Sequence, residues 1–274
     1  MMAVLGSAFL HALWNSLLKV GASRMGAMVL MSVCEIPIGV AVVMALPPLD
    51  HAAVAPWVIG AGCAHFFYKL FLTYAYERGD LSRVYPIARG SAPLVVGIVS
   101  PFFLSDIVTP MEFAGIAVLG AGILMMAQGV FSSGENRKLI PYALGSACAT
   151  ATYTLIDGQG ARVAGDAVAY IAWVFVADGL FFAAGIMLWK GVDVLPRQRK
   201  AWGIGIAAAA ASYGAYAVSV WAMTIAPIAL VAALRETSIL FAVLIGWLVF
   251  GERMTKGKAL AAAVIVGGVM LTRL

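Results

Sequence analysis

Two arginines lie deep inside long apolar stretches, at matching places in the two halves of the 274-residue sequence. A guanidinium in hydrocarbon costs at least ~2.5–3.5 kcal/mol, and this group cannot shed its charge. We therefore expect Arg89 and Arg235 to line a polar internal cavity, where forked cations suit a carboxylate, phosphate or phosphonate. The alternative is a structural ion pair with Glu35, Asp178 or Glu236 that locks helices together.

Two acids occupy equivalent positions in the middle of the second apolar stretch of each half, Glu35 and Asp178. Removal from water favours the neutral form of a carboxyl group, so such a residue can load and release a proton as a cavity opens alternately. It can also bind an amino group. The alternative is a neutral carboxyl hydrogen-bonded to the backbone near Pro37. Glu236 points ~100° away from Arg235 on a helix and is a poor partner for it.

Other polar and aromatic side chains recur at helical spacing. His11, Asn15 and Lys19 fall on one face of the first apolar stretch, and His65 and Lys69 form a similar pair in the third. Packing and interfacial anchoring are the alternative roles for these groups. The candidate substrate-binding residues are Arg89, Arg235, His11, Trp14, Tyr68, Tyr85, Tyr153 and Tyr213. The candidates for proton coupling or ion pairing are Glu35, Asp178, Glu236 and Lys69.

The composition requires that these residues be held by membrane helices. The chain is 63% hydrophobic and 11% charged, with a mean hydropathy of +0.96, whereas soluble domains carry roughly 25% charged residues. The apolar runs are continuous and about twice the length of a barrel strand, which excludes a β-barrel. The sequence predicts an all-α integral membrane protein with ten spans, at 2–20, 26–46, 54–76, 82–104, 110–131, 139–158, 167–189, 201–224, 227–250 and 257–273.

The second half repeats the first. The turn at 104–110 recurs at 250–256 as an acid followed three residues later by threonine, and Ser7 and Trp14 are matched by Ser146 and Tyr153. Five helices is an odd number, so residues 1–134 and 135–274 should form two repeats of opposite orientation. Inverted repeats place a substrate site at the midplane, next to broken helices. The candidate breaks are Pro37, Pro86, Pro93 and Pro101.

Ten short-looped helices in two such repeats resemble the drug/metabolite transporter superfamily, in its EamA-type branch. The segment 248–255, LVFGERMT, followed by a helix of small residues, is similar to the end of that family's repeat. The resemblance covers essentially the whole chain. It implies a central cavity lined by the first four helices of each repeat, with the fifth helix packing outside. The arginine motifs are not general to the superfamily and indicate a subgroup.

The leading hypothesis is a secondary active transporter of a small polar or zwitterionic metabolite, such as an amino acid, a related organic anion or a phosphonate. An exporter of cationic drugs or quaternary amines is the alternative within transport, and a passive channel or structural membrane subunit the alternative outside it. No phosphate-binding loop of the Gly-x4-Gly-Lys-Ser/Thr type is present. Scattered histidines and acids disfavour an enzyme, a metal site or any other cofactor. We expect a small-molecule substrate, a lipid bilayer and proton coupling, no nucleic acid, and a monomer or homodimer.

Basic residues predict the orientation of the chain, in what we expect to be a bacterial inner membrane. The positive-inside rule places the odd-numbered connections in the cytoplasm and both termini outside. Asp157 and Arg162 are expected in a solvated turn after the sixth span. The basic residues in or near odd-numbered connections are Arg24, Arg137, Lys138, Lys190, Arg197, Arg199, Lys200, Arg253, Lys256 and Lys258, against Arg162 and Arg273 at the other end.

Overall fold

The computed structural model describes residues 2–18, 23–78, 81–103, 106, 108–132, 138–250 and 255–272. Regular structure in these residues is helical. The helices are α1 (Met2–Leu17), α2 (Arg24–Ala45), α3 (His51–Tyr76), α4 (Leu81–Phe103), α5 (Pro110–Ser132), α6 (Leu139–Ala164), α7 (Ala167–Lys190), a 3-10 turn η2 (Val192–Val194), α8 (Arg199–Ile225), α9 (Ile228–Arg235), α10 (Ser238–Phe250) and α11 (Lys256–Leu271).

The helices do not break at the prolines that the sequence analysis named as candidate breaks. α2 continues through Pro37, and α4 is one helix across all three of its prolines; neighbouring helices in a bundle can satisfy the backbone groups that a proline frees. The predicted ninth span is instead divided into α9 and α10 at Glu236 and Thr237. There the amides of both residues bond to carbonyls only two or three positions back, and the Thr237 hydroxyl donates to the Leu234 carbonyl at 2.7 Å.

Two helices also extend beyond the spans predicted for them. α6 was predicted to end at 158 but continues to Ala164, where Gly165 adopts a left-handed conformation (φ 73°) and its amide bonds to the Ala161 carbonyl. α3 begins at His51 because Asp50 accepts hydrogen bonds from the amides of Ala52 and Ala53 and so caps the helix. Because α6 continues beyond Asp157, this residue lies inside the bundle rather than in a solvated turn.

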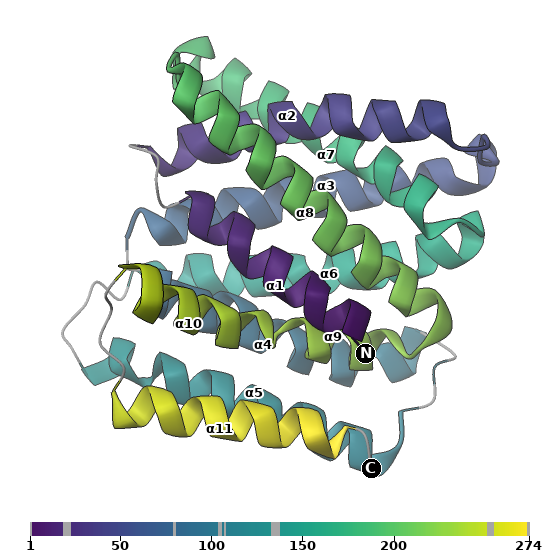
Figure 1. Ribbon diagram of the computed structural model, residues 1–274. Coiled ribbons are helices and arrows are strands. Elements are labelled where there is room, and N and C mark those ends of the chain that lie inside the picture. Colours follow the sequence, from purple (N-terminus) through teal and green to yellow (C-terminus); the bar gives the residue numbers. More distant parts are fainter. Residues whose placement is uncertain are drawn as a thin grey trace.

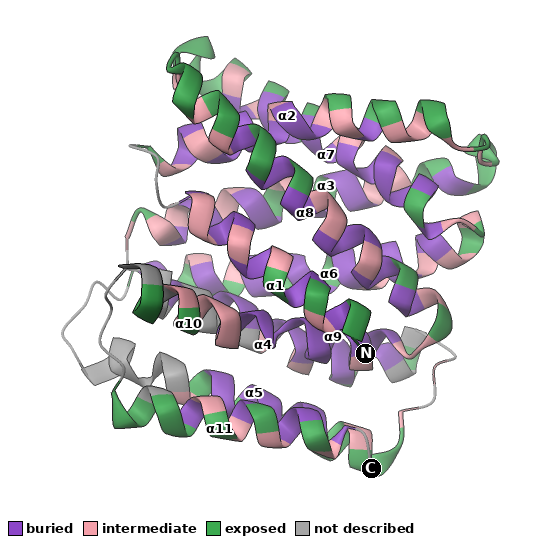
Figure 2. Cartoon of the chain, in the orientation of Figure 1, coloured by how far each residue is buried: buried purple, intermediate pink, exposed green. Residues whose placement is uncertain are grey.

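The helices form a bundle in which distant segments lie side by side (Figure 1). α2 packs on α7, α3 on α6, α1 on α8, and α4 on α6. α5 and α11 pack on one another at one side of the molecule, and α4 joins that pair to the rest. Buried residues run along the central helices, whereas exposed residues alternate with them on α2, α8 and α11 (Figure 2).

Small residues let α5 and α11 approach closely. A Cβ added at Gly268 would lie 2.5 Å from the backbone nitrogen of Leu119, and one at Gly122 would lie 2.8 Å from that of Ile265. Neither backbone can yield that much space, so both positions require glycine.

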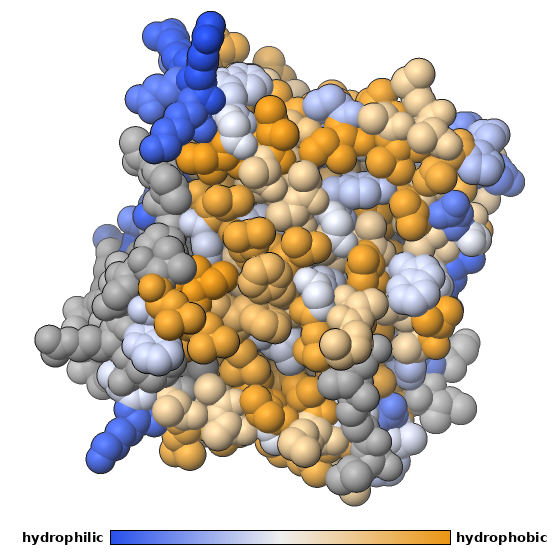
Figure 3. Space-filling view, in the orientation of Figure 1, coloured by the Kyte–Doolittle hydropathy of each residue, from blue (hydrophilic) through white to orange (hydrophobic). Residues whose placement is uncertain are grey.

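The surface is that of a membrane protein. Within the described part of the chain, five helical segments are long and apolar enough to cross a bilayer: Arg24–Ala45, Leu139–Ala164, Ala167–Lys190, Arg199–Ile225 and the joined α9 and α10 over Ile228–Ile245. Figure 3 shows a hydrophobic face between two ends, with hydrophilic residues gathered at one of them. That end carries the α7–α8 connection with Arg197, Arg199 and Lys200, and we name it the basic end. The other, the termini end, carries both ends of the chain (Figure 1).

Candidate functional site

A small cavity of about 30 Å³ lies in the middle of the bundle. Its volume is that of one water molecule, well below that of an amino acid, so a larger solute enters only if side chains or helices move. The lining comes from α1, α2, α3, α6, α7, α8 and α9. It consists of His11, Trp14, Met31, Glu35, His65, Tyr68, Lys69, Tyr153, Phe175, Asp178, Ser212, Tyr216 and Arg235.

The two matched acids meet at one lysine on the cavity wall. The Lys69 ammonium lies 2.6 Å from an oxygen of Glu35 and 2.6 Å from an oxygen of Asp178, and it donates to the Ser32 hydroxyl at 2.8 Å. All three charged side chains are buried, so the charges depend on one another for stability. Glu35, Lys69 and Asp178, the acid–lysine triad, carry a formal net charge of −1. The other Asp178 oxygen has no hydrogen-bond partner in the described part of the chain.

Arg89 is completely buried and bound by the protein itself. It contacts the Nε2 of His11, donates to the Tyr153 hydroxyl at 3.3 Å, and lies 3.6 Å from a carboxylate oxygen of Glu236. The indole N–H of Trp14 donates to the other ring nitrogen of His11 at 3.2 Å. This arginine is absent from the cavity lining, and its contacts tie α4 to α1, α6 and the break after α9.

Arg235 differs from Arg89 although the two occupy matching places in the sequence. Its guanidinium carbon lies 5.0 Å from the centre of the Tyr216 ring, a cation–π contact. It lines the cavity, and no hydrogen bond or ion pair joins its guanidinium to another described residue. The structure therefore presents one unpaired forked cation to the cavity, on the last turn of α9.

A further charged cluster, not recognised in the sequence, surrounds Asp157. This side chain is fully buried, and its carboxylate lies 2.9 Å from the Nε2 of His65. It also accepts hydrogen bonds from the hydroxyls of Tyr216 at 2.5 Å and Tyr170 at 3.2 Å. The ring of His65 stacks on Tyr153, with 4.1 Å between ring centres. Asp157 lies within the predicted sixth span, near its end and one turn beyond Tyr153 on the same face, so helical spacing was the signal that could have found it.

The structure gathers most of the sequence candidates around the cavity but leaves three outside its lining. Trp14, Tyr68 and Tyr153 line it with the residues already described. Tyr213 does not; its hydroxyl donates to the Val168 carbonyl at 3.1 Å. Arg89 and Glu236 lie behind the lining, and the side chain of Tyr85 lies outside the described residues.

An ion pair fastens the termini end. Arg162 donates to both carboxylate oxygens of Asp106, at 2.8 and 3.0 Å, and to the carbonyls of Met223 and Ala226. Asp106 also accepts the backbone amide of Ile228 at 2.9 Å, which caps the first turn of α9. This latch joins the end of α6, the segment after α4 and the α8–α9 connection. Arg162 is therefore a structural residue of a fastened end, not a member of a solvated turn.

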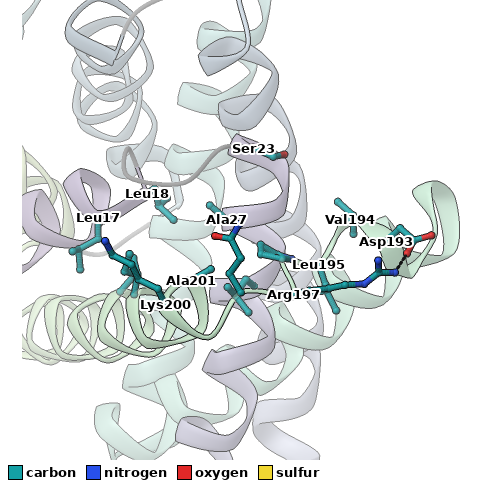
Figure 4. Close-up of a pocket in the computed structure, with 16 residues that line it drawn as sticks. Leu17, Leu18, Ser23, Ala27, Asp193, Val194, Leu195, Arg197, Lys200 and Ala201 are labelled. Carbon is teal, nitrogen blue, oxygen red and sulfur yellow. Dashed lines mark hydrogen bonds and ion pairs between the residues drawn. The ribbon is translucent and has the colours of Figure 1, made fainter.

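The basic end is hollowed instead. An end cavity of about 450 Å³ lies between the end of α1, the start of α2 and the first turns of α8. Its wall includes Leu18, Ala27 and Ala208, and Lys200 and Arg197 lie at its rim (Figure 4). Leu17 on α1 and Ala208 on α8 lie one turn from the central-cavity residues Trp14 and Ser212, so the two cavities follow the same helices.

Charged side chains are concentrated in this centre. Seven charged side chains are buried among the described residues: the acids Glu35, Asp157, Asp178 and Glu236 and the bases Lys69, Arg89 and Arg235. Ionisable residues inside a membrane bundle face polar cavities or partners and mark solute or proton pathways. No group of three histidine, cysteine or acidic side chains in the described ranges is arranged to hold a metal ion.

The fold and this centre define the class: an all-helical integral membrane protein with an internal charged cavity. The model of the EamA-like transporter family matches residues 137–274, and the protein belongs to that family, a group of membrane transporters of the drug/metabolite type. A protein of known crystal structure has the same fold, with a TM-score of 0.77 over 100% of this chain and 99% of that one at 18% sequence identity. No curated protein sequence matches the chain.

Proposed function

We propose that the protein is a secondary active transporter of a small zwitterionic metabolite, such as an amino acid, and that it works by alternating access at the central cavity. One observation carries the proposal: the unpaired Arg235 guanidinium and the net-negative acid–lysine triad line the same cavity. A molecule with a carboxylate and an ammonium group complements both walls.

The roles of the charged residues differ in this scheme. Arg235 binds the substrate carboxylate, and the free oxygen of Asp178 accepts the substrate ammonium beside Lys69 and Glu35. Arg89 is a positioning residue that holds His11 and Tyr153, because its own donors face protein groups. The aromatic rings of Trp14, Tyr68 and Tyr153 enclose the solute.

Helix packing supports two inverted five-helix repeats, 1–134 and 135–274, with ten spans in which α9 and α10 count as one. Under a twofold axis in the membrane plane, a helix packs either on its own counterpart in the other half, or on another helix in a contact that the counterparts of both helices repeat. α2 packs on its counterpart α7 and α5 on its counterpart α11, while the α3–α6 contact has its counterpart in α8–α1. The site then lies between the halves, as in other inverted-repeat transporters, and access alternates as one half rocks against the other.

Proton coupling fits the acid–lysine triad. Two carboxylates share a single ammonium group there, so one proton neutralises the site when the cavity is shut away from water. We place the protein in a bacterial inner membrane as a monomer or homodimer, with the basic end in the cytoplasm according to the positive-inside rule.

A binding experiment tests the substrate class. Purified protein in detergent is heated with amino acids, organic acids, phosphonates or quaternary amines, since a bound ligand raises the apparent melting temperature by mass action. We expect zwitterionic amino acids to stabilise it and to exchange across proteoliposomes. Stabilisation by quaternary amines alone would replace this proposal with the cation-exporter alternative.

Two arginine variants test the assigned roles. Loss of a charge-assisted hydrogen bond of about 1.5–3 kcal/mol weakens binding roughly 10- to 100-fold, so Arg235→Gln should raise Kd by that factor with little change in melting temperature. Arg89→Gln should mainly lower the melting temperature. Arg197→Gln is the matched control, because that side chain is exposed at the basic end. Unchanged affinity in Arg235→Gln would contradict the proposal.

A further inference from the structure

We propose that the cluster of Asp157, His65, Tyr170 and Tyr216, the aspartate cluster, is a proton-binding gate that closes the central cavity towards the termini end. The inference rests on the proposed alternating-access cycle, but it assigns a second proton site, outside the acid–lysine triad, and a moving part to go with it.

The repeat relates this cluster to the open end of the molecule. By the offset that relates Trp14 to Tyr153, Asp157 corresponds to Leu18; by the offset that relates Glu35 to Asp178, Tyr170 corresponds to Ala27. Leu18 and Ala27 line the end cavity at the basic end. The equivalent space towards the termini end is filled by the buried Tyr170 ring and the Asp157 carboxylate.

Tyr170 fits this space closely. A Cβ added at Gly160 would lie 2.3 Å from the Tyr170 hydroxyl, so the ring occupies the space next to the α6 backbone. Its hydroxyl donates to Asp157, which also binds Tyr216 on α8 and His65 on α3. One carboxylate thus joins four helices. Opening towards the termini end has to separate them, along with the Asp106–Arg162 latch at the rim.

His65 couples this gate to a proton. Its ring lines the cavity, and its Nε2 faces Asp157. With a neutral imidazole the cluster buries one unpaired negative charge, which is costly away from water; with an imidazolium it buries a neutral ion pair. Closing the termini end therefore favours a bound proton, and a bound proton favours closure. A proton taken up from the termini end leaves through the cavity once the basic end is open.

The charged and titratable groups around His65 belong to seven other helices or to α3 itself. On α3 they are Lys69 and Tyr68; on the others they are His11 of α1, Glu35 of α2, Arg89 of α4, Tyr153 and Asp157 of α6, Tyr170 and Asp178 of α7, Tyr216 of α8, and Arg235 of α9. Asp157 is the acidic group in direct hydrogen-bond contact with the imidazole. It is therefore the group whose removal should most change His65 protonation.

Histidine NMR tests the proton site without any substrate. The chain has three histidines, so protein labelled with ¹⁵N in histidine gives three pairs of ring-nitrogen signals, and the loss of one pair in His65→Gln assigns His65. We expect Asp157→Asn to shift the His65 signals towards those of a neutral imidazole, because the carboxylate that favours the imidazolium is removed. Unchanged His65 signals in Asp157→Asn would overturn the proton site.

Cysteine labelling tests the gate. Ala161 is buried one turn beyond Asp157 towards the termini end. With Cys34, Cys63 and Cys148 replaced by serine, an Ala161→Cys variant should react slowly with a water-soluble maleimide. Its rate, divided by that of an exposed cysteine at the same pH to correct for the thiolate fraction, should fall further as pH falls. Tyr170→Phe removes one hydrogen bond to a carboxylate and should speed the reaction about tenfold.

Controls separate the possible failures. Tyr142→Phe, which alters a tyrosine of α6 at the basic end, should leave labelling unchanged. His65→Gln should abolish the pH dependence that remains after correction for the thiolate fraction. Equal labelling rates in Tyr170→Phe and its parent would overturn the gate even if Asp157→Asn fails to fold. If these results hold but no zwitterion binds, the proposed substrate fails and the gate stands. If zwitterions bind but the corrected labelling rate does not change with pH, only the gate fails.

Discussion

Replacing Lys69 with methionine should destabilise the protein in a way that depends on pH. The substitution keeps much of the side-chain volume but leaves Glu35 and Asp178 facing each other. Carboxylate oxygens that each lie 2.6 Å from one nitrogen are at most about 5.2 Å apart, so at an effective dielectric constant of ~20 their repulsion is at least ~3 kcal/mol. Removing one partner of a buried ion cluster costs a similar ~3–5 kcal/mol.

At low pH the two carboxyl groups can share one proton, which removes the repulsion. The stability that this proton restores is present at low pH and is lost as pH rises and the proton leaves. We therefore expect Lys69→Met to melt roughly 6–12 °C below wild type at pH 8, taking about 2–4 °C per kcal/mol, and to recover much of the difference at pH 5.5.

The assay is thermal unfolding of detergent-purified protein, followed by the loss of the monodisperse peak in gel filtration. Lys256→Met is the control, because Lys256 is exposed at the start of α11. Adding Glu35→Gln to Lys69→Met should restore stability at pH 8, since one carboxylate remains. A Lys69→Met protein with wild-type stability at both pH values would refute the triad, as would a double variant less stable than the single one.

Three further predictions concern the frame around the cavity. Arg162→Ala should lower the melting temperature by several degrees, because it releases Asp106 and the α8–α9 connection, whereas Arg197→Ala, which removes an exposed ion pair, should not; equal effects would argue against the latch. Gly268→Ala should destabilise the protein by pushing α5 and α11 apart, while Gly267→Ala, with no atom within 4 Å, should be neutral or stabilising. A C-terminal reporter that works only outside the cytoplasm should be active, and activity of a cytoplasmic reporter instead would reverse the orientation.

The sequence predicted the helices well because apolar runs of membrane length leave little choice of structure. The polar groups were harder. The division at Glu236 and Thr237 has no proline to signal it, and it depends on short-range hydrogen bonds where a charged segment is buried. Pro37 suggested a break that the bundle does not make, since membrane helices accept proline when neighbours satisfy the backbone.

The candidate residues were found by type, but their partners were not. Arg89 and Arg235 have the same charge and matching places, yet one is held by protein groups and the other faces the cavity. That difference depends on which side chains the neighbouring helices bring, which spacing along one chain does not encode. Asp157 was missed because it lies in the last turn of the predicted sixth span and was assigned to a solvated turn, whereas α6 continues beyond it to Ala164.

The imbalance among the buried charges has an electrical consequence. With neutral histidines, the four buried acids and three buried bases of the described core give it a net charge of −1. A zwitterion adds no net charge, so a carrier loaded with substrate and with one proton, on either the acid–lysine triad or the aspartate cluster, is neutral, whereas the empty, deprotonated carrier is negative. A membrane potential acts on a transferred charge with about 2.3 kcal/mol per 100 mV. Voltage should therefore govern the return of the empty protein, while the loaded step proceeds at a rate that the potential does not change.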